Sequence, residues 1–189
     1  LPAQGAVTGW DCGPGNVLMD LWIQRHRQQA YDAGGAWAAS GRILPDLLQH
    51  LLEEPWFALP APKSTGRDLF HADWLDQRLA GRADQAEDIQ ATLCALTART
   101  IANATRAHHP ATLYLCGGGV HNHALAGMLA SELPGTRIFT TAELGVDPDW
   151  VEAYAFAWLA YRCLHHQPAN LPAVTGARGL RVLGAIYPK

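Results

Sequence analysis

The chain has 189 residues and a net charge of -3; 49% of its residues are hydrophobic and 16% are charged. This composition can build a substantial core and excludes a disordered chain. The charge gives no electrostatic reason to expect nucleic acid or a membrane as a partner. No apolar run reaches the roughly 18 residues that a membrane-spanning helix needs. We expect one large domain or two small ones in a cytoplasmic protein, and the missing initiator Met leaves open that the sequence is part of a longer one.

Cysteine usage indicates reduced thiols. The four cysteines are Cys12, Cys94, Cys116 and Cys163. They are widely separated and form no CxxC pair, which argues against a disulfide framework. Cys12 and Cys116 adjoin glycine-rich turns, but neither has a base beside it in the sequence. We therefore expect the cysteines to be small buried filler rather than nucleophiles.

The first half of the chain is predicted to hold one strand and several helices. Apolar residues 5–11 predict a strand that ends at Asp11, and Asn16 is a good N-cap for the helical pattern that follows it. The Gly- and Ala-rich segment 30–41 is expected to be a loop anchored by Trp37. Further elements are expected as short helices at 43–53 and 70–80, a proline-stiffened stretch from 56, a turn at 63–68 and a long helix at 83–108.

The second half alternates strands and helices. An apolar strand that begins near residue 111 runs into three glycines, and a helix is expected to start near Asn122. Residues 136–150 supply a further short strand and a loop, and the last long helix is expected from near Pro148 to about His165. Few strands among many helices indicate α/β layer packing with a small sheet, or half of a larger architecture.

Two strand-turn-helix units share one design. Their turns read DCGPGN at 11–16 and CGGGVHN at 116–122. Glycine lets the backbone approach a ligand closely, and a helix N-terminus attracts phosphate, so a nucleotide cleft between the two turns is one interpretation. The alternative is a pair of tight connections with polar caps. The absence of GxGxxG and of GxxxxGK[ST] argues against a dinucleotide fold and a P-loop.

The histidines offer a metal interpretation that we reject. They occur as His108-His109, His121-x-His123 and His165-His166. Adjacent histidines on a helix point in different directions, and no third ligand is spaced to complete a site. We expect no metal bound by protein side chains alone.

Several blocks resemble the C-terminal half of the anhydro-N-acetylmuramic acid kinase family. They are GWDCGPGNVLMDLWI, GAWAASG, FALPAPKSTGRDLF, LYLCGGGVHNHAL, ELGVDPDWVEAYAFAWLA, LPAVTGA and LGAIYP. They follow the family's order and cover nearly the whole chain. The resemblance implies the sugar kinase, Hsp70 and actin superfamily, in which two ribonuclease-H-like lobes enclose a nucleotide cleft.

The resemblance implies that residues 1–189 form the C-terminal lobe of a two-lobe kinase. This lobe is expected to be an α/β, ribonuclease-H-like unit of the actin-like ATPase superfamily, with a small mixed sheet packed against several helices. The family's N-terminal lobe carries a GTSxDGxD-type phosphate loop, and no such stretch occurs here. We therefore expect the chain to need its own N-terminal lobe as a partner, to be inactive alone, and to form a homodimer as the complete protein.

The implied reaction uses ATP and Mg²⁺ in peptidoglycan recycling. The family hydrolyses the 1,6-anhydro ring of anhydro-N-acetylmuramic acid and phosphorylates the freed O6. Asp11 matches the family's catalytic carboxylate and would act as a general base toward the attacking water. The other residues that match are Gly13, Gly15 and Asn16 on the phosphate and substrate side, and Gly117, Gly118 and Gly119 on the adenosine side.

Other polar residues carry two interpretations each. Lys63 and Arg67 either contact phosphate or sugar or are solvated loop charges, and Glu152 either helps to bind the sugar or compensates a helix dipole. Trp37, Trp56 and Trp158 either stack on a ligand or pack in the core. Two alternatives to the main function also stay open: a kinase for another sugar, and a non-catalytic sugar sensor or interaction lobe of the same superfamily.

Overall fold

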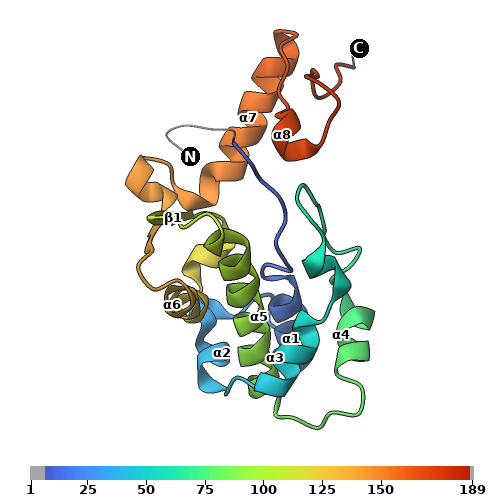
Figure 1. The fold of residues 1–189 in the computed structure, drawn as a ribbon, viewed down its shortest axis with the longest axis vertical. Coiled ribbons are helices and arrows are strands. Elements are labelled where there is room, and N and C mark those ends of the chain that lie inside the picture. The colour runs from blue at the N-terminus through green and yellow to red at the C-terminus, as the bar shows by residue number, and fades with distance from the viewer. Residues whose placement is uncertain (1–6, 188–189) are drawn as a thin grey trace.

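The computed structural model describes residues 7–187 and is built around one long helix (Figure 1). This helix, α5 (Ala86–Arg106), carries Glu87 and Asp88 in its first turn, where acidic side chains compensate the helix dipole. Most of its residues from Asp88 to Ala102 are buried. Since both apolar and small polar side chains of α5 are covered, it is the centre of the core and not a surface helix.

Four helices pack against α5: α1 (Val17–Arg27), α2 (Ala36–Ser40), α3 (Pro45–Leu52) and α6 (His123–Glu132). Each buries its apolar side against the same core, whose most deeply buried members include Leu18, Ile23, Leu47, Leu51, Phe70, Leu93, Leu96 and Leu129. The packing confirms the predicted helices after Asn16, within 43–53 and within 83–108.

The remaining elements are short. They are α4 (Ala72–Arg78), α8 (Pro172–Thr175) and the 3₁₀ turns η1 (Ala33–Gly35), η2 (Pro55–Ala58), η3 (Gly118–His121), η4 (Thr141–Leu144) and η5 (Pro148–Trp150). The last long helix is α7 (Val151–Leu164). Its bounds and those of α4 lie within the predicted ranges.

The sheet of residues 7–187 has two strands, β1 (Thr112–Leu115) and β2 (Arg137–Thr140). They run parallel, with Thr112 opposite Arg137 and Leu115 opposite Thr140, and α6 lies between them in the chain. The prediction of a small sheet is confirmed. The prediction that it is mixed is wrong, because its two strands are joined through a helix that returns the chain in the same direction.

The predicted strand at 5–11 is wrong for the residues that the structure describes. Residues 7–11 are extended coil, and the backbone N–H of Asp11 donates to Lys63 O at 3.1 Å. A strand needs a neighbour with a regular series of donors, and the stretch before Lys63 contains Pro60 and Pro62, which have no N–H. Residues 5 and 6 lie outside the described part.

The predicted loop at 30–41 contains a helix. The Asp32 carboxylate accepts hydrogen bonds from the backbone N–H groups of Trp37 and Ala38, at 2.9 and 2.8 Å, and so satisfies the first turn of α2. Trp37 is buried, which confirms its predicted anchoring role. A segment of Gly and Ala has no apolar periodicity, so the pattern missed a helix that a buried carboxylate stabilises.

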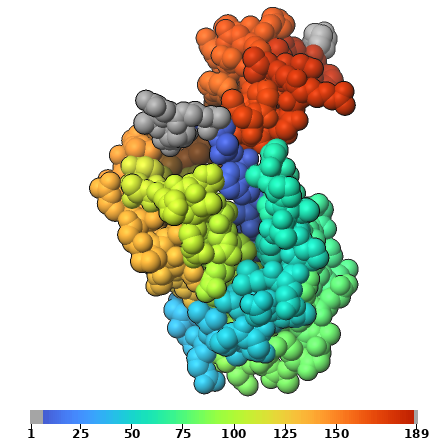
Figure 2. Space-filling view, in the orientation of Figure 1, coloured from blue at the N-terminus to red at the C-terminus, as the bar shows by residue number. Residues whose placement is uncertain are grey.

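The end of the chain stands away from the core. Figure 2 shows α7, α8 and the tail above the body of the molecule. No residue of α7 is buried, and Phe156 and Trp158 are 70% and 50% exposed. The expectation of core packing therefore holds for Trp37 and is wrong for Trp158 within residues 7–187. Trp56 is half-buried beneath the Lys63 ammonium, which lies 4.2 Å from its ring.

All four cysteines are free thiols. Cys94 is buried on α5, and burial raises its pKa to about 12. Burial also raises the pKa of Cys12. Cys116 is exposed, so buried filler describes Cys94 and not Cys116.

Among the described residues, no helix combines the length and apolar character that crossing a membrane requires.

We predict that Gly41→Ala destabilises the protein by at least about 2 kcal/mol, a common cost of overpacking. A Cβ at Gly41 would lie 2.0 Å from the Glu87 carbonyl oxygen, at the start of α5. Gly127→Ala is the matched control, because Gly127 is exposed on α6 and has open space around it. The control should gain up to about 1 kcal/mol from helix propensity. Urea unfolding of both variants measures the difference, and equal midpoints would contradict the packing.

Candidate active site

The Asp11 carboxylate is held by a loop from elsewhere in the chain. Its Oδ2 accepts a hydrogen bond from Ser64 Oγ at 2.7 Å and another from the backbone N–H of Thr65 at 2.8 Å. The side chain of Asp11 is otherwise exposed to solvent. Asp11 and the neighbouring Lys63 were predicted from the sequence as site residues, and Ser64 was not. The available signal was the pair of hydroxyl residues in KST, which cluster with Asp11 only in the folded chain.

The turn after Asp11 is clamped onto α5. A Cβ at Gly13 would lie 2.5 Å from Thr100 Oγ1, so only glycine permits this approach. Gly15 has φ +57°, and its carbonyl accepts a hydrogen bond of 2.6 Å from Thr97 Oγ1. The core helix therefore fixes the position of Asp11 through two threonines. The turn that carries Asp11 is therefore held in place by the packed core.

Asn16 occupies the N-cap position of α1, as predicted, but its side chain makes no capping hydrogen bond and its backbone is helical. The side chain lies against the second turn instead: a Cβ at Gly119 would be 3.6 Å from Asn16 Nδ2. The two glycine turns that sequence analysis singled out are therefore neighbours. Whether they serve a nucleotide or only connect elements stays a prediction at this point.

The second turn depends on one glycine with a positive φ and on one helix cap. Gly117 has φ +73°, and its N–H donates to Pro148 O at 2.9 Å. Asn122 caps α6 by accepting from the backbone N–H of Leu125 at 2.9 Å. Gly118 has open space where a side chain would be. The turn is fixed at both ends while its middle faces a void.

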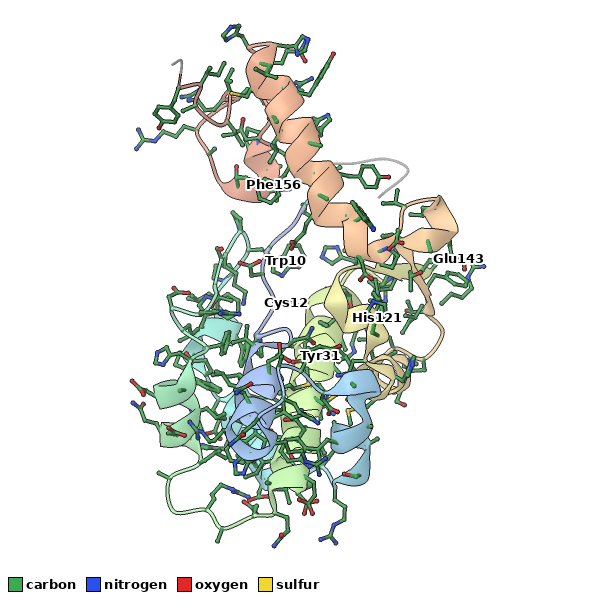
Figure 3. The ribbon with its side chains drawn as sticks, turned by 180° about the vertical axis from the view of Figure 1, so that it is seen from behind. Trp10, Cys12, Tyr31, His121, Glu143 and Phe156 are labelled. Carbon is green, nitrogen blue, oxygen red and sulfur yellow. The ribbon has the colours of Figure 1, made fainter. Side chains whose placement is uncertain are left out.

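A cavity of about 340 Å³ with several polar side chains in its wall lies where the two turns meet. Tyr31 and His121, labelled in Figure 3, lie on its walls. The lining also includes Asn16, Met19, Asp20, Asp32, Gly34, Gly118 and Asn122. Its volume falls at the lower end of small-molecule sites, and its side chains offer both donors and acceptors.

Asp20 separates this cavity from a neighbouring one of about 390 Å³ that Arg67 lines. Burial raises the pKa of the Asp20 carboxyl, and the nearby positive charge of Arg67 opposes the shift. Arg67 is exposed. The structure therefore places Arg67 within electrostatic reach of the cavity wall, and its predicted contact with phosphate or sugar stays a prediction.

Lys63 is engaged by the protein itself. Its ammonium donates to the carbonyls of Trp56 and Phe57, at 3.1 and 2.9 Å, and burial lowers its pKa. These contacts hold the loop 63–65 against η2. A predicted contact between Lys63 and phosphate would require the ammonium to leave these partners.

The start of α7 is tied to the second turn. His121 Nε2 lies 2.9 and 3.0 Å from the two carboxylate oxygens of Asp149 on η5, in addition to the bond between Gly117 and Pro148. Glu152 follows in the first turn of α7 and is exposed. The link between His121 and Asp149 was missed because the two residues are 28 positions apart. A role of Glu152 in sugar binding stays a prediction.

Two larger cavities, of about 620 and 960 Å³, flank the segment that leads to Asp11. Trp10 and Cys12, labelled on this segment in Figure 3, line both of them. Their walls are mainly apolar and include Leu52, Phe57 and Leu113.

Among residues 7–187, no three His, Cys, Asp or Glu side chains come together as metal ligands.

Comparison with known proteins identifies the family. A model of the family "Anhydro-N-acetylmuramic acid kinase" matches residues 1–189. Proteins of that name from Nitrosomonas europaea and Pseudomonas syringae pv. tomato are 54% and 55% identical over 100% and 96% of this chain, which covers 52% and 51% of their lengths. A third, from Xanthomonas axonopodis pv. citri, is 53% identical over 100% of this chain and 50% of its own length. The chain spans about half the length of the curated relatives it matches. On this evidence, the chain belongs to the anhydro-N-acetylmuramic acid kinase family.

Proposed function

We propose that this chain is the C-terminal part of an ATP-dependent kinase that hydrolyses the 1,6-anhydro ring of anhydro-N-acetylmuramic acid and phosphorylates O6. The observation that carries the proposal is the placement of Asp11. A fixed, solvent-facing carboxylate stands at the head of one glycine turn, and Asn16 of that turn and Gly118 of the second turn line the same cavity. The names of the relatives support the choice of sugar. Cytoplasmic recycling of peptidoglycan is the role that we propose for the reaction.

In the proposed reaction, Asp11 is the general base. A water attacks the anomeric carbon C1, the bond between C1 and O6 breaks, and Asp11 takes the proton from the water. The freed O6 attacks the γ-phosphorus of ATP, the bond to the bridging oxygen breaks, and ADP leaves. The balance is anhydrosugar, water and ATP in, and sugar 6-phosphate, ADP and one proton out. A positioned base contributes roughly 10²- to 10⁴-fold in rate.

The cavity between the two turns is our proposed nucleotide site. Its wall holds Gly118, whose missing side chain leaves room for a flat ligand, and Asn16 and His121, which supply polar atoms. Mg²⁺ prefers oxygen ligands and usually enters through substrate phosphates plus one or two carboxylates. Asp20 on the cavity wall fits this requirement, and Arg67 beyond it would help to neutralise the phosphates. Bound Mg²⁺ would supply charge neutralisation at the transferring phosphoryl group.

We propose that the chain is one ribonuclease-H-like lobe of an actin-like ATPase fold and that its own N-terminal lobe completes the site. Half the length of the relatives is outside the matched region. The apolar side chains that α7 exposes, among them Tyr154, Phe156 and Leu164, each more than 60% exposed, are available for that lobe. Exposed apolar patches of this kind mark interaction surfaces. We also propose that the complete protein forms a homodimer. Glu152 is proposed to help to bind the sugar.

We predict that the isolated chain does not turn over. Half of a cleft leaves the triphosphate solvated, and electrostatic stabilisation of the transition state is weak in water. Release of ADP in the presence of the anhydrosugar measures this, with the full-length protein as the positive control. ATP-dependent phosphorylation by the purified chain at the rate of the control would refute the proposed division of the site.

Asp11→Asn in the full-length protein should lower kcat at least about 10²-fold, because the amide keeps the size of the side chain but cannot accept the proton of the water. ATP affinity should stay within about two-fold. Asp73→Asn, an exposed carboxylate on α4, is the matched control and should keep native kcat. Near-native kcat in Asp11→Asn would remove Asp11 from the role of base.

Gly118→Val should weaken ATP binding at least about tenfold while sugar binding stays within about two-fold. The open space at Gly118 lets the variant fold, since the positive φ that only glycine adopts without strain belongs to Gly117 and not to Gly118. Gly127→Val, at an exposed position of α6, adds the same side chain away from the cavity and serves as control. Calorimetry with each ligand separates the outcomes, and unchanged ATP affinity would make CGGGVHN only a connection.

A further inference from the structure

The hydrogen bonds of Asp11 are unequal between its two oxygens. Both donors, Ser64 Oγ and the backbone N–H of Thr65, converge on Oδ2. Among residues 7–187, Oδ1 accepts no hydrogen bond. A carboxylate that is gripped by one oxygen has its torsion fixed, and its other oxygen presents lone pairs in a set direction.

The grip is itself anchored. The carbonyl of Ser64 accepts a hydrogen bond of 3.3 Å from Trp56 Nε1, and the preceding Lys63 fastens its ammonium to two carbonyls of η2. On the other side, Asp11 N donates to Lys63 O. The loop 63–65 therefore cannot shift away from Asp11 without losing contacts with both η2 and the Asp11 backbone. This makes it a support for the carboxylate and not a passing contact.

We propose that Ser64 is a positioning residue for Asp11. By holding Oδ2, Ser64 directs Oδ1 of Asp11 toward the attacking water, so that Oδ1 is the oxygen that accepts the proton. The inference rests on the proposed function, in which Asp11 is the general base. The proton of the water arrives on Oδ1 while the two hydrogen bonds to Oδ2 stay in place, and it leaves to solvent after product release. Ser64 touches neither sugar nor nucleotide in this account and acts only through Asp11.

Ser64→Ala in the full-length protein tests the role. Loss of the hydroxyl leaves one donor on Oδ2 and lets the carboxylate rotate, and a misplacement of about 1 Å at a reacting group can cost 10²-fold. We expect kcat to fall about 10- to 100-fold, with KM for ATP and for the anhydrosugar within about two-fold. Ser64→Thr keeps the hydroxyl and should restore most of kcat. Ser131→Ala removes an exposed hydroxyl from α6 and is the matched control.

A double-mutant cycle separates positioning from a merely structural role. In the Asp11→Asn background, Ser64→Ala should lower the residual kcat less than about two-fold, because the group through which Ser64 acts is already disabled. A full additional loss in that background would overturn the inference. So would native kcat in Ser64→Ala, or a raised KM with kcat unchanged. If Ser64→Ala fails to fold, Ser64→Cys keeps the size with a weaker donor, and an intermediate kcat is then required.

The same measurements distinguish the two proposals. If the full-length wild-type protein releases no ADP with the anhydrosugar, the proposed function fails and the role of Ser64 falls with it. If the wild type is active and Asp11→Asn is inactive, the proposed function stands, and the Ser64 variants alone decide the inference.

Discussion

The contact between the glycine turn and two threonines of α5 is the constraint on which the rest depends. Thr100 leaves no room for a side chain at Gly13, and Thr97 holds the carbonyl of Gly15. Because α5 is the centre of the core, the turn cannot move without disturbing the packing of several helices. The stability of the core is thereby used to hold one exposed carboxylate in place.

The core and the exposed elements lie on opposite sides of that turn. On one side, the helices on α5 bury a continuous apolar core. On the opposite side, the sheet of residues 7–187 has two strands, α7 buries none of its side chains, and mainly apolar cavities flank the segment that leads to Asp11. In the proposed lobe arrangement, the half of the relatives that lies outside the matched region packs against these exposed elements.

Helices and strands with strong periodic patterns were predicted correctly, within a few residues of their ends. Patterns failed where an element depends on a partner that apolar periodicity does not record. Residues 7–11 look like a strand but have no neighbour that can form a ladder, and α2 looks like a loop but is stabilised by Asp32. Local pattern records which face a segment buries, whereas a strand or a weak helix also needs partners that the pattern does not contain.

The sequence by itself determined the family, the helix-rich α/β class and the two glycine turns with Asp11 at the head of the first. Only the tertiary structure decided that Asn16 lies against Gly119 and that Ser64, 53 residues from Asp11, bonds to its carboxylate. A motif can be recognised in the sequence alone because the backbone geometry and the chemistry need those residue types at fixed spacing. Contacts between distant residues depend on the path of the whole backbone, and a hydrogen bond forms only where that path brings donor and acceptor within about 3 Å.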